Sequence, residues 1–365
     1  MKYPEFLKEK GTIGFVAPSC GCATSPYKEA FQNALCKWET SGYQFDLGPN
    51  CYADKGIGIS NTPEKCGEEL TKYYLRKEND VLISCGGGEL MCEILGYVDF
   101  EAIKKADPKW YMGYSDNTNM TFLLTTLCDT ASIYGPCAGS FGMEPWHPAV
   151  FDAMSLITGE KRLFKSYGKW ERDGIKDEEH PLAPYHCTEE LQLRTFYPEQ
   201  QAEKENWQMV ETDRISMNGR LIGGCMDCLV NLLGTKFDRV KDFTEKYKED
   251  GFIWFLEACD LNVFGIRRAM WQMEQAGWFR YVKGFLFGRP VCHGQEIMGL
   301  DHYQAVLPYA LRHKVPVIMD ADVGHLSPMI PLICGSMADI HVEKVEKKLQ
   351  SHGCKSEMTV KMELL

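Results

Sequence analysis

The sequence lacks several features that would place the protein at a membrane or on a nucleic acid. It has no apolar run of about 18 residues, and the N-terminal stretch Met1–Ser19 lacks the basic and then apolar pattern of a secretory signal. Basic residues are few, because 40 Lys and Arg stand against 51 Asp and Glu, giving a formal net charge of −11. This excess repels nucleic-acid phosphate and anionic lipid. We therefore expect a cytoplasmic protein with a small-molecule or peptide partner, no nucleic acid and no membrane.

Metal-binding motifs are equally scarce. The chain has no His-Glu-x-x-His sequence. Its 16 cysteines are scattered through apolar segments, where a thiol behaves as a small hydrophobe, and we expect them to be reduced. The close pairs Cys20/Cys22 and Cys225/Cys228 would each be half of a zinc site, but neither has a matching His/Cys pair nearby. We therefore expect no metal and no other cofactor.

The chain does contain enough apolar material for more than one core. It has 365 residues, of which 44% are hydrophobic and 25% charged. This is the profile of a soluble globular protein, and chains of this length usually divide into domains. We expect an N-terminal domain over residues 1–160, an insert over 161–218 and a C-terminal domain over 219–365.

Short β-rich runs alternate with longer amphipathic segments between Thr12 and Pro136. Predicted strands cover 12–18, 43–49, 80–86, 110–115 and 131–136, and predicted helices cover 25–42, 62–78 and 117–129. Such alternation implies an α/β fold with a parallel sheet covered on both faces, in which ligands bind at the carboxyl ends of strands.

The pattern loosens after Met154, and residues 164–218 are rich in charge, Pro, Trp and Tyr. A polar stretch of this length is typical of a functional lid or a solvated excursion. Strand-like and helix-like segments resume at Gly219 and end in a strand-like tail. We therefore predict a second α/β domain in the C-terminal part of the chain.

Ser115 ends the predicted strand 110–115, within the sequence Gly-Tyr-Ser-Asp-Asn. A serine on a sharp strand-to-helix turn has its hydroxyl lifted clear of the sheet, as in a nucleophile elbow. The G-x-S-x-G fingerprint is incomplete, because Asn117 replaces the second glycine. The alternative is that Ser115 and Asn117 only cap the following helix.

Two further apolar segments end in a reactive group. Glu257 closes the apolar run 251–260, where a carboxylate must be paired, and His325 follows a predicted strand and a glycine. With Ser115 they would make a hydrolytic triad, in which the histidine takes the serine proton and the carboxylate fixes the imidazole. Taken singly, Glu257 could be a satisfied buried acid and His325 a loop histidine bonded to backbone.

A glycine run, Gly86–Gly88, separates a predicted strand from a helix-like segment. Glycines let backbone amides approach a phosphate or an oxyanion closely. The run is not a Walker loop, because no Gly-Lys-Ser/Thr follows, and it does not fit G-x-G-x-x-G. Packing of a tight turn is the alternative interpretation.

Six motifs resemble those of the LD-carboxypeptidase family, in the same order and over nearly the whole chain. They are GFVAPS (14–19), GGG (86–88), GYSDNT (113–118), GRLIGGCMDCL (219–229), FLEACD (255–260) and DADVGHLSPMIPLICGSMADI (320–340). Within this family, the microcin C self-immunity peptidases are the subgroup to which the resemblance points.

The resemblance implies a role for each matching position. Ser115 would be the nucleophile, Glu257 the triad carboxylate and His325 the triad base, with the amides of Gly88 and Asp116 as the oxyanion hole. It also implies a flavodoxin-like N-terminal domain that holds the serine and a C-terminal α/β domain with a β-rich core that holds the other two. Members of the family are homodimers that need no metal.

The insert bears on the substrate. Murein-recycling members of the family have a shorter chain, with less between their two domains. Microcin-type members use an aromatic loop in this region to hold a nucleotide. Trp170 and Trp207 are candidates for stacking on a base, with Gly87 as a further substrate-binding position. Either Trp could instead pack the insert onto the domain.

Three functions therefore stand open. The first is a serine peptidase that cleaves an amide or acyl bond in a small peptide-like substrate, namely a peptidyl or aminoacyl nucleotide. The second is a murein tetrapeptide carboxypeptidase that releases D-Ala. The third is a non-catalytic protein that binds an anionic ligand on the glycine loop 86–88.

Overall fold

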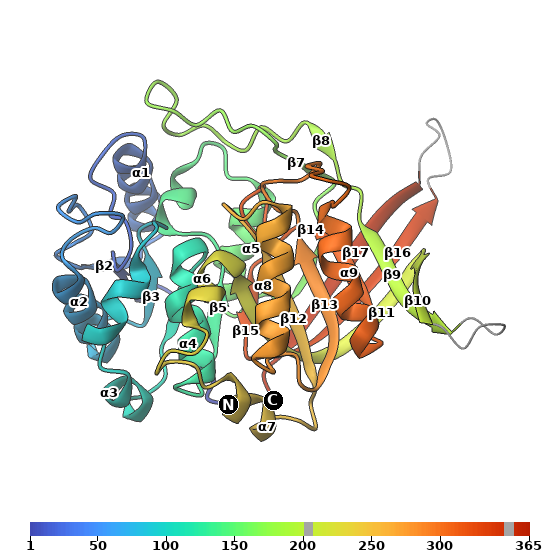
Figure 1. The fold of residues 1–365 in the computed structure, drawn as a ribbon. Helices are drawn as coiled ribbons and strands as arrows, with labels where there is room; N and C mark the ends of the chain where they lie inside the picture. Colours follow the sequence, from blue (N-terminus) through green and yellow to red (C-terminus); the bar gives the residue numbers. More distant parts are fainter. Residues whose placement is uncertain (201–206, 347–353) are drawn as a thin grey trace. The chain divides into compact units, whose positions relative to one another are not determined.

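The computed structural model describes residues 1–200, 207–346 and 354–365, and the chain divides into two compact units (Figure 1). Unit 1 comprises Met1–Lys161, Asp173–His186 and Pro331–Gly335, and unit 2 comprises Arg162–Arg172, Cys187–Ile330 and Ser336–Leu365. The insert at 161–218 is thus divided between the two units.

Unit 1 is built on a six-stranded sheet in the order β15-β5-β4-β3-β1-β2. The parallel strands are β1 (Thr12–Val16), β2 (Gln44–Leu47), β3 (Val81–Ser84), β4 (Trp110–Gly113) and β5 (Ser132–Tyr134). The short strand β15 (Leu332–Cys334) pairs antiparallel with β5. The parallel order 2-1-3-4-5 is the flavodoxin-like one, which confirms the predicted fold.

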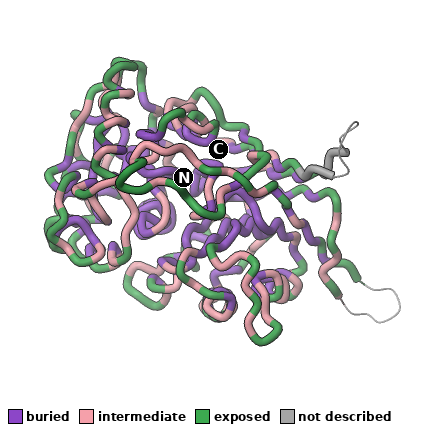
Figure 2. Tube along the Cα trace, turned by 90° about the horizontal axis from the view of Figure 1, so that it is seen from above, coloured by how far each residue is buried: buried purple, intermediate pink, exposed green. Residues whose placement is uncertain are grey.

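Helices and helical turns connect these strands. They are α1 (Tyr27–Thr40), α2 (Pro63–Leu75), η1 (Met91–Tyr97), α3 (Phe100–Lys105), η2 (Ser115–Asn117), α4 (Thr118–Thr126), η3 (Ala138–Gly142) and α5 (Pro148–Ile157). Strands β3 and β4 are buried along their whole length, because helices cover both faces of the sheet. Trp38 of α1 packs against Phe15 of β1 and Phe141 of η3 in the core. Figure 2 shows buried residues concentrated in the interior of the chain trace and exposed ones along its loops.

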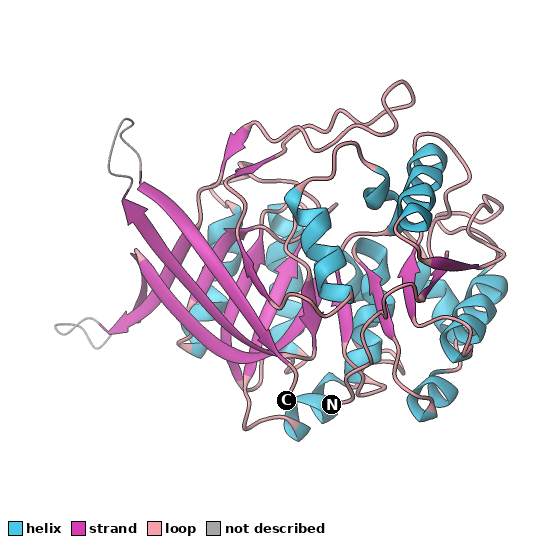
Figure 3. Ribbon diagram, turned by 180° about the vertical axis from the view of Figure 1, so that it is seen from behind, coloured by secondary structure: helices cyan, strands magenta, loops and turns pink. Residues whose placement is uncertain are grey.

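Unit 2 contains a nine-stranded sheet in the order β10-β9-β14-β13-β12-β11-β16-β17-β6. Its parallel centre consists of β11 (Arg214–Cys225), β12 (Phe252–Glu257), β13 (Val282–Gly288) and β14 (Val317–Ala321). Antiparallel strands flank this centre: β9 (Arg194–Gln200), β10 (Trp207–Thr212), β16 (Met337–Glu346), β17 (Cys354–Glu363) and β6 (Leu163–Lys165). Figure 3 shows the long strands side by side. The β-rich second domain was predicted and is confirmed.

Helices cover the parallel centre of this sheet. They are α6 (Met226–Leu232), α7 (Val240–Lys246), α8 (Val263–Gln275) and α9 (His302–His313), of which α8 and α9 lie against β12–β14 in Figure 1. A separate two-stranded ribbon is formed by β7 (Lys169–Trp170) and β8 (Glu189–Glu190). In the described parts of the chain, we find no helix with the length and apolar character needed to traverse a membrane.

The insert is more regular than the sequence predicts. We expected a lid or a solvated excursion over 164–218, but β9 pairs with the edge of the parallel strands at β14, and β10 pairs with β9. Thr195 and Phe196 of β9 are buried, while Tyr197 and Glu199 face solvent. Charged residues and a proline, which are unusual in strands, concealed this pattern in the sequence.

Candidate functional site

Ser115 lies at the turn between β4 and the helical segment η2–α4. Its backbone has φ +62°, in the left-handed region that non-glycine residues seldom adopt. The residue before it, Tyr114, is extended, so the chain reverses sharply at the serine. The Ser115 amide donates a hydrogen bond to the Tyr134 hydroxyl at 3.3 Å. A strained serine between a buried strand and a helix has the backbone geometry of a nucleophile elbow.

The glycine loop approaches this turn closely. A Cβ added to Gly87 would lie 3.2 Å from Ser115 Cβ and 3.3 Å from its Oγ, and one added to Gly88 would lie 2.6 Å from the Gly58 carbonyl. A side chain at Gly88 would therefore force the loop to move, and one at Gly87 would crowd the hydroxyl. The absence of a side chain at Gly87 leaves backbone next to the Ser115 hydroxyl, which is what an oxyanion-binding loop requires.

Asp116 and Asn117 tie the turn to the glycine loop. The buried Asp116 carboxylate accepts hydrogen bonds from the Ser19 hydroxyl at 2.6 Å and from the Met91 amide at 2.9 Å. The side-chain amide of Asn117 donates a hydrogen bond to the Gly86 carbonyl at 2.8 Å. Sequence reasoning had used only the backbone amide of Asp116 and had treated Asn117 as a missing glycine. An acid and an amide directly after an apolar strand were the signal for this role, because such groups need partners.

Glu257 and His325 meet in unit 2. Glu257 ends β12, whose six residues are all buried, and its side chain is fully inaccessible. The Nδ1 atom of His325, in the turn after β14, lies 2.7 Å from Glu257 Oε2. The carboxylate thereby fixes the orientation of the ring and directs Nε2 away from Glu257, as a triad base requires.

Charge at this pair favours the protonated imidazole. Burial is the largest single effect on the pKa of His325 and lowers it, but the charge of Glu257 and the side-chain hydrogen bonds with Cys259 and Glu257 together raise it by more. The pKa of His325 therefore lies well above its ordinary value. Such a ring accepts a proton readily and stabilises the resulting positive charge.

Two glycines allow the close approach of the His325 turn to Glu257. Gly324 has φ +102°, and a Cβ there would lie 2.6 Å from Glu257 Oε2. A Cβ on Gly288, at the end of β13, would lie 3.2 Å from Glu257 Cβ. The glutamate side chain thus occupies the space that side chains at these two positions would need.

Asp227 was missed by sequence reasoning. Its carboxylate accepts hydrogen bonds at 3.0 Å from the backbone amides of Cys259, Asp260 and Leu261, and so holds the loop that follows Glu257. Asp227 lies in the first turn of α6, where a negative charge is also favoured by the helix dipole. An acid within the largely apolar segment 219–229 was the available signal, because such a group needs partners.

Two clusters in unit 2 bring together side chains of the types that ligate metals. Their members are Cys225, Glu257 and His325 in one, and His293, His302 and Asp320 in the other. In the first, His325 Nδ1 and Glu257 Oε2 already bond to each other at 2.7 Å, and a side-chain hydrogen bond with Cys228 together with burial raises the pKa of the Cys225 thiol well above its ordinary value. In the second, the guanidinium of Arg172 lies 3.4 Å from His293 Nδ1, and this positive charge opposes a cation. Neither cluster is therefore suited to a resident metal.

The structure separates the two candidate tryptophans. Trp170 is 4% exposed, and the guanidinium carbons of Arg172 and Arg289 lie 4.9 and 5.1 Å from its ring centroid. This placement favours the packing role for Trp170. Trp207 is half-buried on β10, with the Lys314 ammonium 4.4 Å from its ring centroid.

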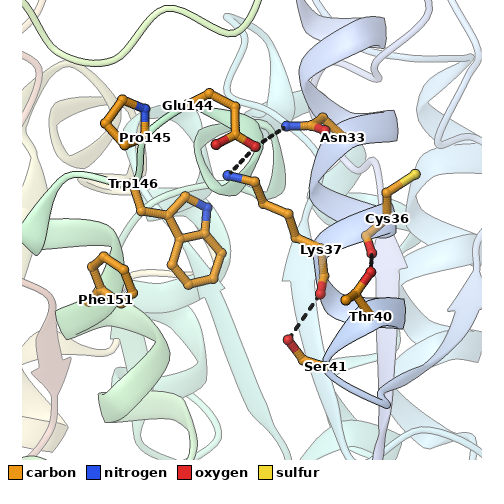
Figure 4. Close-up of a pocket in the computed structure, with 9 residues that line it drawn as sticks. All are labelled: Asn33, Cys36, Lys37, Thr40, Ser41, Glu144, Pro145, Trp146 and Phe151. Atoms are coloured by element: carbon orange, nitrogen blue, oxygen red, sulfur yellow. Dashed lines mark hydrogen bonds and ion pairs between the residues drawn. The ribbon is translucent and has the colours of Figure 1, made fainter.

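A pocket of about 540 Å³ lies elsewhere in unit 1 (Figure 4). Lys37 pairs with Glu144 at 2.9 Å and lies 5.2 Å from the Trp146 ring centroid, and Asn33 also donates to Glu144. The residues that line this pocket include none of the predicted site residues, and its two charged groups neutralise each other. We assign it no part in the chemistry.

Comparisons with known proteins place this geometry in context. Two family models match the chain, the LD-carboxypeptidase N-terminal domain over residues 13–135 and the LD-carboxypeptidase C-terminal domain over residues 218–340. A probable murein peptide carboxypeptidase of Bacillus subtilis (strain 168) is 24% identical over 345 residues, which cover 92% of this chain and 90% of the relative. The microcin C7 self-immunity protein MccF of Escherichia coli is 23% identical over 336 residues, which cover 89% and 88%. The solved structure of MccF in complex with glutamyl sulfamoyl guanosine has a TM-score of 0.74 at 20% identity, covers 98% of both chains and shares the fold.

Gly324 supplies a test of the contact between Glu257 and His325. In Gly324→Ala, the added methyl group would lie 2.6 Å from Glu257 Oε2. We expect this clash to separate the ring from the carboxylate, so that the pKa of His325 falls toward the ordinary histidine value of about 6.5. NMR titration of the His325 ring signals measures the change.

Gly294→Ala is the matched control. Gly294 also has a positive φ, +84°, but no atom lies within 4 Å of a Cβ built there. This variant carries a similar backbone strain without the clash, and its His325 should titrate as in the wild type. If Gly324→Ala also titrates as the wild type, the contact as described is contradicted.

Proposed function

This chain belongs to the LD-carboxypeptidase family, and on that premise we propose that it is a serine peptidase with Ser115, Glu257 and His325 as its catalytic triad. The observation that carries the proposal is the 2.7 Å contact between His325 Nδ1 and the buried Glu257 carboxylate. The positive φ of Ser115 supports the assignment of the nucleophile. The turn at Ser115 and the family, together with this contact, favour a peptidase over a binding protein without chemistry. The contact alone does not, because a buried imidazole–carboxylate contact also joins His302 to Asp320 at 2.9 Å.

The proposed reaction follows from these contacts. The Ser115 hydroxyl attacks the scissile carbonyl while His325 Nε2 takes its proton, and Glu257 stabilises the imidazolium. The backbone amides of Gly88 and Asp116 donate hydrogen bonds to the oxyanion. His325 then gives the proton to the leaving group, and water releases the acyl group from Ser115 by the reverse steps.

We further propose that the acyl group is carried by a nucleotide, so that the substrate is a peptidyl or aminoacyl nucleotide. The likeness to MccF, which is solved with glutamyl sulfamoyl guanosine, supports this choice. Neither predicted tryptophan is placed to stack on a base of that substrate: Trp170 packs against two arginines, and Trp207 lies beside Lys314, before the start of β14, whereas His325 follows the end of that strand. Release of D-Ala from a murein tetrapeptide is the second candidate, supported by the murein peptide carboxypeptidase relative.

We also propose that the protein is a cytoplasmic homodimer and that it works without a metal.

Ser115→Ala tests the nucleophile. Removal of the hydroxyl should lower turnover of any accepted substrate by several orders of magnitude, on the order of 10⁶ where a serine is the sole nucleophile. The melting temperature should stay close to that of the wild type, because a half-buried hydroxyl contributes little to the core. Chelators should leave wild-type turnover unchanged. Turnover that survives the substitution would exclude the serine mechanism.

Assay of both substrate classes on the same preparation tests the leaving group. We expect cleavage of aminoacyl-nucleotide analogues. Trp207→Ala, beside Lys314 at the other end of β14 from His325, and Trp146→Ala, in the separate pocket of unit 1, should both bind them as the wild type does. Cleavage of murein tetrapeptide with no action on any acyl nucleotide would defeat the nucleotide proposal in favour of the murein one.

A further inference from the structure

Arg289 follows β13 directly and is one of the largest fully buried side chains, with 1% of its surface exposed. Its Nη2 donates to Asp322 Oδ1 at 2.6 Å, and the Asp322 side chain is completely buried. The Nε of Arg289 is also buried and has no hydrogen-bond partner among the described residues. A buried ion pair with an unsatisfied donor adds little to stability compared with apolar residues of similar volume. Stability alone therefore does not explain why Arg289 and Asp322 are buried together.

The guanidinium spans the turn that carries His325. Its Nη1 donates to the Asp320 carbonyl at 2.9 Å, and its Nη2 reaches the Leu326 carbonyl at 3.3 Å. Asp320 lies near the end of β14, before the turn, and Leu326 directly follows His325. One planar group thereby holds both ends of the turn.

Asp322 fixes the middle of the same turn. Its second carboxylate oxygen, Oδ2, accepts from the Tyr167 amide at 2.7 Å, and its backbone carbonyl accepts from the Ile330 amide at 2.8 Å. The Trp170 ring covers the guanidinium, with its centroid 5.1 Å from Arg289 Cζ, and shields the ion pair from water. Arg289 and Asp322 thus hold the turn at its two ends and at its middle.

The turn needs such an external restraint. Gly324, directly before His325, has φ +102°, and a glycine has more conformational freedom than any other residue. The ring must nevertheless keep Nδ1 at 2.7 Å from Glu257. A rigid fork with several donors in fixed directions suits this task, whereas a lysine ammonium would act as a single point charge on a flexible chain.

We propose that Arg289 is the positioning residue of the triad base: through Asp322 and the carbonyls of Asp320 and Leu326, it holds the turn that sets His325 against Glu257. Arg289 acts through the turn and not on the substrate. The proposal rests on the proposed serine peptidase function, because that function gives His325 its task.

Arg289→Lys and Arg289→Met test the proposal by the titration of His325, followed by NMR with His325→Gln to assign the signals. We expect the pKa of His325 to fall in both variants toward the ordinary histidine value, because the ring loses its fixed contact with Glu257. With any accepted substrate, kcat should fall about 10²-fold, the usual cost of a small misplacement of a catalytic group, while KM changes little. The acid limb of the kcat/KM profile should move to lower pH, since the neutral ring is then reached sooner.

A folded Arg289→Lys or Arg289→Met whose His325 titrates as in the wild type would overturn the proposal, even if its melting temperature is lower. Should the single variants fail to fold because Asp322 is left unpaired, the double variant Arg289→Met/Asp322→Leu removes both charges and is read in the same way. The titration needs no substrate. It therefore decides the positioning role separately from the peptidase function, which stands or falls with the turnover of Ser115→Ala.

Discussion

The hydrogen bond between the buried Glu257 carboxylate and the His325 imidazole is the interaction on which the architecture around the candidate site in unit 2 depends. A carboxylate at the end of an all-buried strand is tolerated only with a partner of high donor strength. The surroundings serve that contact, because Gly324 leaves space for it, Asp227 anchors the loop after Glu257, and Arg289 anchors the turn that bears His325. The raised pKa of His325 is the electrostatic consequence.

Unit 1 places the strained turn at Ser115 beside the glycine loop. The parallel sheet brings the carboxyl ends of β1, β3 and β4 to one edge, where the loops that follow them meet. Asp116 and Asn117 bond to Ser19, Met91 and the glycine loop, so the strained serine is held by its neighbours and not by its own preference. Each unit thus prepares one half of the proposed chemistry by fixing side chains through buried polar contacts.

The sequence predicted the parts of this account that are encoded locally. The alternation between residues 12 and 136 predicted the strands of unit 1 to within a few residues, because amphipathic periodicity and helix starts are local signals. The apolar surroundings of Glu257 predicted that it is paired, and the reactive groups at the ends of apolar segments, together with the family resemblance, pointed to His325 as its partner. Strand β9 and the Arg289–Asp322 pair were not predicted, since each depends on contacts with residues distant in sequence. The burial of Trp170 against Arg172 and Arg289 could not be predicted from the sequence for the same reason.

The central claim is that His325 activates Ser115, and the most direct measurement is the rate at which an organophosphorus fluoridate modifies Ser115, located by mass spectrometry. The reagent needs only a nucleophilic serine and its base, so the answer does not depend on the natural substrate. The account predicts selective modification of Ser115, faster as pH rises and the His325 ring loses its proton, and slower by several orders of magnitude in His325→Gln. Modification of Ser115 at the same rate in wild type and His325→Gln, or no modification of Ser115 in the wild type, would contradict it.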